Sequence, residues 1–463
     1  MQQKSDKPIL IMFLCGFVIL ALSVALNQPM VDTPPLFGNP PDEHARFLIP
    51  QYICEHGEIP TGLEEEVRIP SYGFSYGLYN VFPYIVQGYV MRLVSCFTNS
   101  AVTLLAAARL VNVAFGTMMA FVVYLLSRRI FEDRRFQWLF CFGVMYLPQS
   151  IFVHTYVNSD SCCMLSTAMM VYGLVLSYQD GINRKNSVWM SGGIILCALS
   201  YYNAYGYILS CILLFLAYFL QRKDGKVTYD WKNMLKKGSF IAVIVLLGIG
   251  WWFIRSYIVL DGDILGLETR QEMAAMYADD IVNPLNDRTY RDRGYSVWEM
   301  IQEKDTFEAA FYGFVAAYGS MTILGSIWLY RVYKVFFGMG IVGSLYYLIN
   351  CKGRKKFSGK KIFFHLNMIF CALMPMVLML YYAYTMDYQD QGRYLLPALL
   401  PIMYYTVKGV EKLLGIRWKQ FKLPDLVVKG VIVLLFLMLI IGTVDVIFFR
   451  AMPVYGKLGM VLS

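Results

Sequence analysis

The segment from Pro8 to Leu26, PILIMFLCGFVILALSVAL, is apolar throughout and contains no charged side chain. A helix needs about 20 apolar residues to cross a bilayer, so this run is long enough to span. Lys4 and Lys7 precede it, and no clear small-residue cleavage site accompanies it. This pattern is typical of a retained anchor whose N-terminus is cytoplasmic.

The composition extends this interpretation to the whole chain. Its 463 residues are 57% hydrophobic and 16% charged, with a mean hydropathy of +0.49. Soluble globular proteins have about 25% charged residues, so the composition excludes an ordinary cytosolic enzyme. The sequence predicts an all-α polytopic protein of the cell membrane.

The formal net charge of +9 arises from 41 Lys and Arg against 32 Asp and Glu. Most of the basic residues lie in short loops between apolar runs, as expected for cytoplasmic loops, and this distribution argues against a nucleic-acid partner. The basic loops contain Arg128–Arg129 with Arg134–Arg135, Arg184–Lys185, Lys232 with Lys236–Lys237, and Arg354–Lys356 with Lys360–Lys361.

Placing these loops inside predicts eleven crossings, at about 8–26, 101–127, 137–157, 161–178, 188–202, 205–220, 238–260, 327–349, 362–382, 394–413 and 426–448. Two further apolar runs do not fit as crossings, because each would move the basic loops that follow it to the outer side of the membrane. Gly77–Phe97 is amphipathic and is therefore placed on the outer surface, together with Phe311–Leu324. We expect a single membrane-embedded domain over residues 1–463. Its long outer loops, 27–100 and 261–326, should contain amphipathic surface helices.

This topology gathers five polar clusters at the extracytoplasmic surface. They are Pro40–His44, Asn158–Asp160, Trp251 through Arg255 to Asp263, the acidic loop 261–310, and Asp390–Tyr394. The crossings contain few ionisable groups near the membrane midplane. This distribution favours a site at the outer boundary over a transport site within the membrane.

The first cluster contains two adjacent acids, Asp42 and Glu43. With Asn39 as N-cap and Pro40 as the first helical residue, both acids would lie near the first turn of a helix. Adjacent helical residues point about 100° apart, so one acid could act as a general base or metal ligand while the other holds the loop. The simpler interpretation is a capped surface helix in which Asp42 pairs with Arg46. Asp160 similarly opens an apolar helix, where an N-cap role would be sufficient.

Three arginines are candidate phosphate contacts. Arg109 lies two turns into its crossing, roughly 12 Å below the outer surface, and needs an anionic partner. Asp160, Asp42 and a lipid phosphate are the candidates, and a structural ion pair is as reasonable as a ligand contact. Arg255 and Arg393 lie at outer helix ends, where long cationic side chains also extend to the interface without any ligand. No pair of histidines has helical metal-binding spacing.

Together these residues resemble the polyprenyl-phosphate-sugar-dependent glycosyltransferases of the GT-C fold. That group includes protein O-mannosyltransferases and lipid A aminoarabinose transferases, and the chain looks closest to a bacterial branch found with surface-polysaccharide genes. The resemblance lies in Pro41–Phe47, Ala108–Leu110, Asn158–Asp160, Trp252–Asp263 and Gln391–Pro397, which occur in the same order over nearly the whole chain. Ser256 stands where the family has asparagine, and Asn203–Gly206 contains no lysine, which puts contacts to the donor head group in question.

The resemblance implies transfer of a sugar from a polyprenyl-phosphate donor to an extracytoplasmic hydroxyl of a glycan or protein, with a cell-surface glycan expected first. It implies Asp42 as base, supported by Glu43, and Asp160 as a holder of acceptor or metal. It also implies phosphate contacts for Arg109 and Arg393, and we add Arg255. The motifs contribute the further candidates His44, Asn158, Asp263, Gln391 and Tyr394. If a divalent metal takes part, Asp42 and Asp160 are its candidate ligands; no other cofactor is indicated. A transporter or flippase of lipid-linked glycans is the alternative function, since it too would need embedded cations.

Overall fold

The computed structural model describes residues 6–30, 39–79, 81–223, 226–286, 289–350, 359–389, 391–415, 417–418 and 421–458. Helices dominate these residues, and the strands form only short two-stranded hairpins. The chain is an all-α polytopic membrane protein, as the sequence predicted. Seven of the described helices are long and apolar enough to cross a membrane: α1 (Lys7–Ala25), α4 (Ala101–Ile130), α7 (Asp160–Asp180), α10 (Trp231–Val259), α14 (Ile327–Asn350), α15 (Gly359–Thr385) and α17, which begins at Asp425 and ends at Val444.

The other four predicted crossings also coincide with helices, but these are shorter. They are α5 (Arg134–Met145) with α6 (Pro148–Val153), α8 (Arg184–Ala198), α9 (Tyr205–Tyr218), and η4 (Gly392–Ala398) with α16 (Leu399–Leu414). Prolines explain both interruptions: Pro148 is the first residue of α6, and Pro397 lies within the 3-10 turn η4. The total of eleven crossings stays a prediction.

The two runs that were excluded from the crossings form short elements. The first contains α3 (Phe82–Ser95), which packs between α2 (Glu43–His56) and α4. The second contains α13 (Thr306–Val315) and the hairpin of β3 (Ala317–Tyr318) and β4 (Ile323–Leu324). The later long loop also contains α11 (Leu267–Tyr277) and α12 (Val297–Glu303). The predicted helices of both loops are therefore present.

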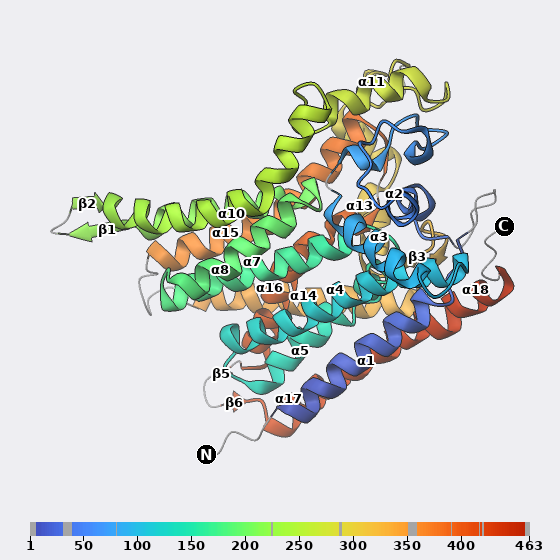
Figure 1. Cartoon of the computed structure of the whole chain (residues 1–463). Coiled ribbons are helices and arrows are strands. Elements are labelled where there is room, and N and C mark those ends of the chain that lie inside the picture. Colours follow the sequence, from blue (N-terminus) through green and yellow to red (C-terminus); the bar gives the residue numbers. More distant parts are fainter. Residues whose placement is uncertain are drawn as a thin grey trace.

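The short elements and the basic loops lie at opposite ends of the helix bundle. Figure 1 shows α2, α3, α11 and α13 together at one end. The start of α1 lies at the other, with the hairpins β1–β2 (Leu220–Lys223, Lys226–Tyr229) and β5–β6 (Arg417–Trp418, Phe421–Lys422). Ion pairs join basic loops there: Arg129 pairs with Asp180 at 3.0 Å, and Arg135 with Asp425 at 3.0 Å. The predicted basic loop at Arg354–Lys356 lies outside the described residues.

Candidate active site

Asp42 stands at the start of α2 in an unusual backbone conformation. It is the N-cap residue, with φ of 58° in the left-handed region, and its side chain makes no capping hydrogen bond. The expected cap at Asn39 and start at Pro40 were wrong, because a residue that precedes proline avoids the helical conformation and Pro41 therefore delays the helix. Non-glycine residues adopt left-handed backbone at a cost of order 1 kcal/mol, and such conformations cluster at functional sites.

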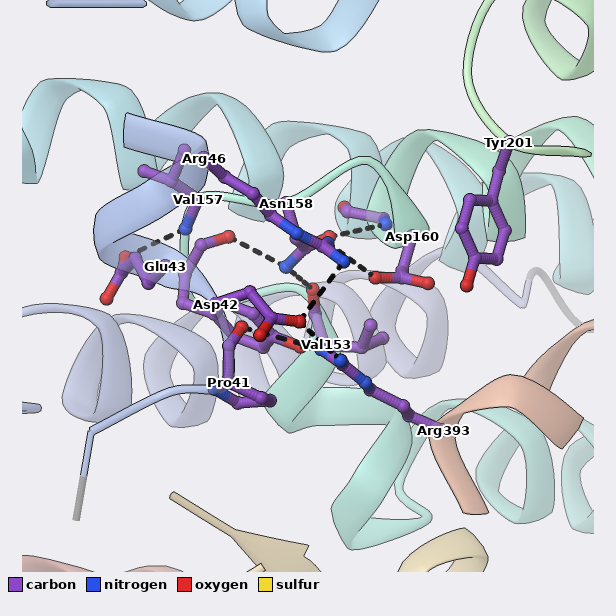
Figure 2. A network of polar contacts seen from close by, with 12 residues as sticks. Pro41, Asp42, Glu43, Arg46, Val153, Val157, Asn158, Asp160, Tyr201 and Arg393 are labelled. Carbon is purple, nitrogen blue, oxygen red and sulfur yellow. Dashed lines mark hydrogen bonds and ion pairs between the residues drawn. The ribbon is translucent and has the colours of Figure 1, made fainter. Parts of the chain in front are cut away.

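The carboxylate of Asp42 lies between two guanidinium groups (Figure 2). Its Oδ2 is 2.7 Å from Nη2 of Arg393 and 3.7 Å from Nη2 of Arg46. The Asp42–Arg46 pair is the one that the simpler interpretation, a capped surface helix, predicted. Burial would raise the pKa of this carboxyl, but the two cations outweigh burial and lower the pKa below its ordinary value. The side chain is 37% exposed, so the carboxylate is accessible, and the lowered pKa favours its ionised form.

Arg46 connects Asp42 to the second predicted acid. Its Nη1 donates to Oδ2 of Asp160 at 3.1 Å, and its guanidinium lies 5.2 Å from the ring centre of Tyr76. Asp160 is the first residue of α7, as expected, although Ser159 occupies the N-cap position. Both Arg46 and Asp160 are almost fully buried. The two acids therefore meet around one cation, although 118 positions separate them in sequence.

Arg393 approaches from η4 and closes the far side of the site. Besides the ion pair with Asp42, its Nη1 donates to the carbonyl of Pro41 at 3.4 Å, and its Nη2 donates to the Tyr394 hydroxyl at 3.2 Å. The Arg393 side chain is only 3% exposed, which places this charge beside Asp42 in a largely dry setting. Tyr394 also donates to Gln389, whereas no contact joins the neighbouring Gln391 to Asp42 among the described residues.

Glu43 points away from Asp42 into the protein and pairs with Arg109. The Arg109 guanidinium donates to both Glu43 carboxylate oxygens, at 2.8 and 2.6 Å, and to the carbonyls of Ala25 and Gln28 at 3.0 and 2.9 Å. Each side chain is 1% exposed. The expected protein partners of Arg109, Asp160 and Asp42, were wrong: the divergence of adjacent helical side chains brings Glu43 to it instead. Its observed polar contacts are with protein groups.

The turn that carries Asp160 is built by buried amides. Asn158 donates to the carbonyls of Val153 and Tyr156, at 2.9 and 2.8 Å, and accepts from the Ser161 amide at 2.9 Å. Asn112 on α4 donates to the Asn158 carbonyl at 3.2 Å. The Val157 amide, in turn, donates to Glu43 at 2.8 Å, which ties this turn to the first loop.

Two residues of this framework were missed in the sequence. Gln87 on α3 donates to Asn112 at 3.0 Å, and Gln28 donates to the Thr155 carbonyl at 2.5 Å. Only Gln87 gave a signal, since an amide within a largely apolar segment needs a hydrogen-bond partner, but the partner itself was not identifiable.

Three other candidates are placed elsewhere by their contacts. Arg255 donates to the carbonyls of Ile59 and Pro60, at 3.1 and 2.8 Å, and so holds the first loop. Asp263 accepts from the amide and hydroxyl of Thr269, at 2.9 and 3.0 Å, near the start of α11. His44 is exposed on α2. Within the described part of the chain, the side-chain hydrogen bonds of Arg255 and Asp263 are therefore made away from Asp42 and Asp160.

The donor set does not fit a metal held by protein ligands. Among the described residues, no group of three or more His, Cys, Asp and Glu side chains is arranged to hold an ion. Between Asp42 and Asp160, where a bridging cation would be expected, the guanidinium of Arg46 is already paired with both carboxylates.

The comparisons concern the fold. No family model and no curated protein matches the chain. The oligosaccharyltransferase of Archaeoglobus fulgidus, solved with a tethered acceptor peptide, is similar over 95% of this chain and 55% of its own, with 18% identity and a TM-score of 0.51. The same organism's oligosaccharyltransferase AglB, solved with an inhibitory peptide and a dolichol-phosphate, is similar over 97% of this chain and 56% of its own, with 14% identity and a TM-score of 0.52. The chain thus spans about half the length of these structures, and it has the GT-C-like fold that its motifs predicted.

Proposed function

We propose that this protein is a membrane glycosyltransferase. It would move a sugar from a polyprenyl-phosphate donor to an extracytoplasmic hydroxyl, first of all one on a cell-surface glycan, with inversion at the anomeric carbon. The observation that carries the proposal is the accessible Asp42 carboxylate, held between Arg393 and Arg46 at the end of a GT-C-like bundle. The fold supports it, since the similar structures are oligosaccharyltransferases, one of them solved with a dolichol-phosphate.

In this reaction the acceptor oxygen forms a bond to the anomeric carbon while the bond from that carbon to the phosphate oxygen breaks. The acceptor proton passes to the Asp42 carboxylate, and the lipid phosphate leaves with the bonding electrons. A carboxylate with a lowered pKa is a weak base toward a free hydroxyl. Proton transfer would therefore accompany formation of the carbon–oxygen bond, when the hydroxyl has become acidic.

The remaining residues divide into those near the reacting atoms and those that position them. Arg393 is the proposed phosphate contact, because its buried charge lies beside Asp42 and would stabilise the departing anion. Asp160 would orient the acceptor, with Arg46 fixing its distance from Asp42. Arg109 and Glu43 form a positioning pair beneath them, and Arg255 positions the first loop.

The test is release of lipid phosphate by the purified protein in lipid. A panel of radiolabelled undecaprenyl-phosphate sugars is supplied with crude cell-wall acceptor, and release is compared between wild type and Asp42→Asn. Loss of general base catalysis should lower the rate by about 10²-fold or more. Full activity of Asp42→Asn would remove Asp42 as the base. Movement of labelled lipid between leaflets, without release from any donor, would assign the chain to the transporters.

Asp261→Asn is the matched control. Asp261 is also exposed and also has left-handed backbone, with φ of 49°. Asparagine tolerates this conformation as well as aspartate does, so both substitutions change the charge without new backbone strain. We expect Asp261→Asn to retain wild-type release.

A further inference from the structure

Three cations stand on the outside of the bundle, away from the Asp42 site. Arg331 and Lys334 lie in the first turns of α14, and Arg450 lies in the π-helical segment η5 (Asp445–Ala451) that continues α17. All three side chains are exposed. We refer to Arg331, Lys334 and Arg450 as the basic patch.

Aromatic and polar contacts connect the members of the basic patch. The Lys334 ammonium lies 5.4 and 5.7 Å from the ring centres of Phe311 and Tyr312, and the Tyr312 ring lies 4.4 Å from that of Tyr330. Arg331 is three residues from Lys334 on the same helix and is therefore its neighbour on the helix surface.

Arg450 reaches the same region from η5. Its Nη2 donates to the Ser326 hydroxyl at 2.7 Å, and Ser326 donates to Asp445 at 2.5 Å. Ser326 directly precedes α14, so Arg450 is held at the start of the helix that carries Arg331 and Lys334.

The charge of the basic patch is only partly compensated by protein. Within the described residues neither Arg331 nor Lys334 forms an ion pair. The nearby Glu308 accepts a hydrogen bond from the Tyr312 hydroxyl at 2.6 Å, and Asp445 is held by Ser326. A single cation at the end of a spanning helix extends to the interface without a ligand, so the grouping of three cations here is what indicates an anionic ligand.

Apolar side chains around the basic patch face outward. Ile327 and Phe449 are each 71% exposed, and Trp328 and Phe448 are 38% and 41% exposed. Exposed aromatic residues at the end of a spanning helix are typical of the membrane–water interface. A ligand at the basic patch would contact cations with its head group and apolar side chains with its tail. A lipid with a phosphate head group fits both requirements.

The basic patch lies at the same end of the bundle as Asp42. The Tyr330 hydroxyl donates to the Ala316 carbonyl at 2.5 Å, and Ser320, two residues beyond β3, donates to the Asn39 carbonyl at 3.2 Å. Helix α13 also packs on η4, which carries Arg393. Helix α13 and its hairpin thus contact both the start of α14, which carries the basic patch, and the segments that carry Asp42 and Arg393.

We propose that the basic patch binds the phosphate of a membrane lipid, and that its occupant is the polyprenyl phosphate on its way to or from the Asp42 site. The assignment of polyprenyl phosphate as the occupant rests on the proposed function. The inference that the basic patch binds a lipid phosphate does not rest on it.

The experiment measures lipid binding to purified protein in neutral-lipid nanodiscs, by native mass spectrometry, without acceptor or turnover. The probes are undecaprenyl phosphate, phosphatidylglycerol and undecaprenol, which has no phosphate. Arg331→Gln/Lys334→Gln should raise the apparent Kd for undecaprenyl phosphate about tenfold, because it removes two of the three cations of the basic patch. Binding of undecaprenol should not change.

Lys232→Gln/Lys236→Gln is the matched control, since it removes two exposed cations from the start of α10 at the other end of the bundle. It should bind both phosphates as wild type does. If the Arg331→Gln/Lys334→Gln variant loses affinity equally for undecaprenyl phosphate and phosphatidylglycerol, the basic patch is a lipid-phosphate site, but its occupant is bulk anionic lipid and not polyprenyl phosphate. Unchanged affinity for both phosphates in the Arg331→Gln/Lys334→Gln variant would overturn the proposal. If undecaprenyl phosphate binding depends on the basic patch but the protein releases no lipid phosphate from any donor, the binding site stands and the proposed transferase function is rejected.

Discussion

Replacing Glu43 by alanine should destabilise the protein strongly, because Glu43 compensates a charge that has no access to water. In the structure it accepts two hydrogen bonds from Arg109 and one from the Val157 amide, and both charged side chains are 1% exposed. Breaking a buried ion pair from one side costs about 3–5 kcal/mol. An unpaired buried amide adds about 1–3 kcal/mol. The carbonyls of Ala25 and Gln28 still accept from Arg109 and reduce the first cost, so we expect a loss of roughly 4 kcal/mol.

The assay is equilibrium unfolding in mixed micelles, followed by tryptophan fluorescence, for Glu43→Ala, Glu43→Gln, Arg109→Met and the Glu43→Leu/Arg109→Met pair. Glu43→Gln keeps an acceptor for Val157 and should lose less than Glu43→Ala. The double variant removes both charges and should be more stable than Glu43→Ala, since no charge is left unpaired. A loss below about 1 kcal/mol for Glu43→Ala would refute the reasoning, because an exposed pair contributes no more than that.

Three further predictions concern the Asp42 site. Arg46→Lys should reduce turnover about tenfold or more, because an ammonium cannot hold Asp42 and Asp160 with the fork of a guanidinium; kcat of the purified variant checks this. The lowered pKa of Asp42 means that its ionised form persists as pH falls, so the acid limb of the rate profile should lie below about pH 4. Arg393→Gln should move that limb upward, and a profile that does not move would show that another group titrates. Arg255→Gln should change the KM for donor less than about threefold, since its contacts are with loop carbonyls; titration of the donor concentration measures it, and an increase of about tenfold (1.4 kcal/mol) would instead place Arg255 on the donor.

The helices were predictable because their signal is local. Apolar length and basic loops identify a spanning segment from its own residues, and each predicted crossing coincides with a helix in the structure. The breaks were less predictable. Pro148 and Pro397 interrupt two segments whose hydropathy alone favoured continuous crossings, and the tertiary structure accommodates the interruptions.

The candidate site was predictable only in its local part. The Asp42–Arg46 pair follows from a four-residue spacing on one helix. The contacts of Arg46 with Asp160 and of Asp42 with Arg393 depend on how distant segments pack, which no spacing reveals. Arg109 was correctly expected to need an anionic partner, but choosing Glu43 over Asp42 required the direction in which each side chain leaves α2.

The separation of these contacts in the chain has a consequence for biosynthesis. In the order of synthesis, Arg109 becomes available to Glu43 once α4 has been made, and Asp160 becomes available to Arg46 at the start of α7. Arg393, however, lies 351 residues beyond Asp42. Because synthesis proceeds from the N-terminus, Asp42 has no Arg393 to pair with until most of the chain has been made. The ion pairs of Asp42 are therefore completed late in synthesis, when the segment that contains η4 has been made.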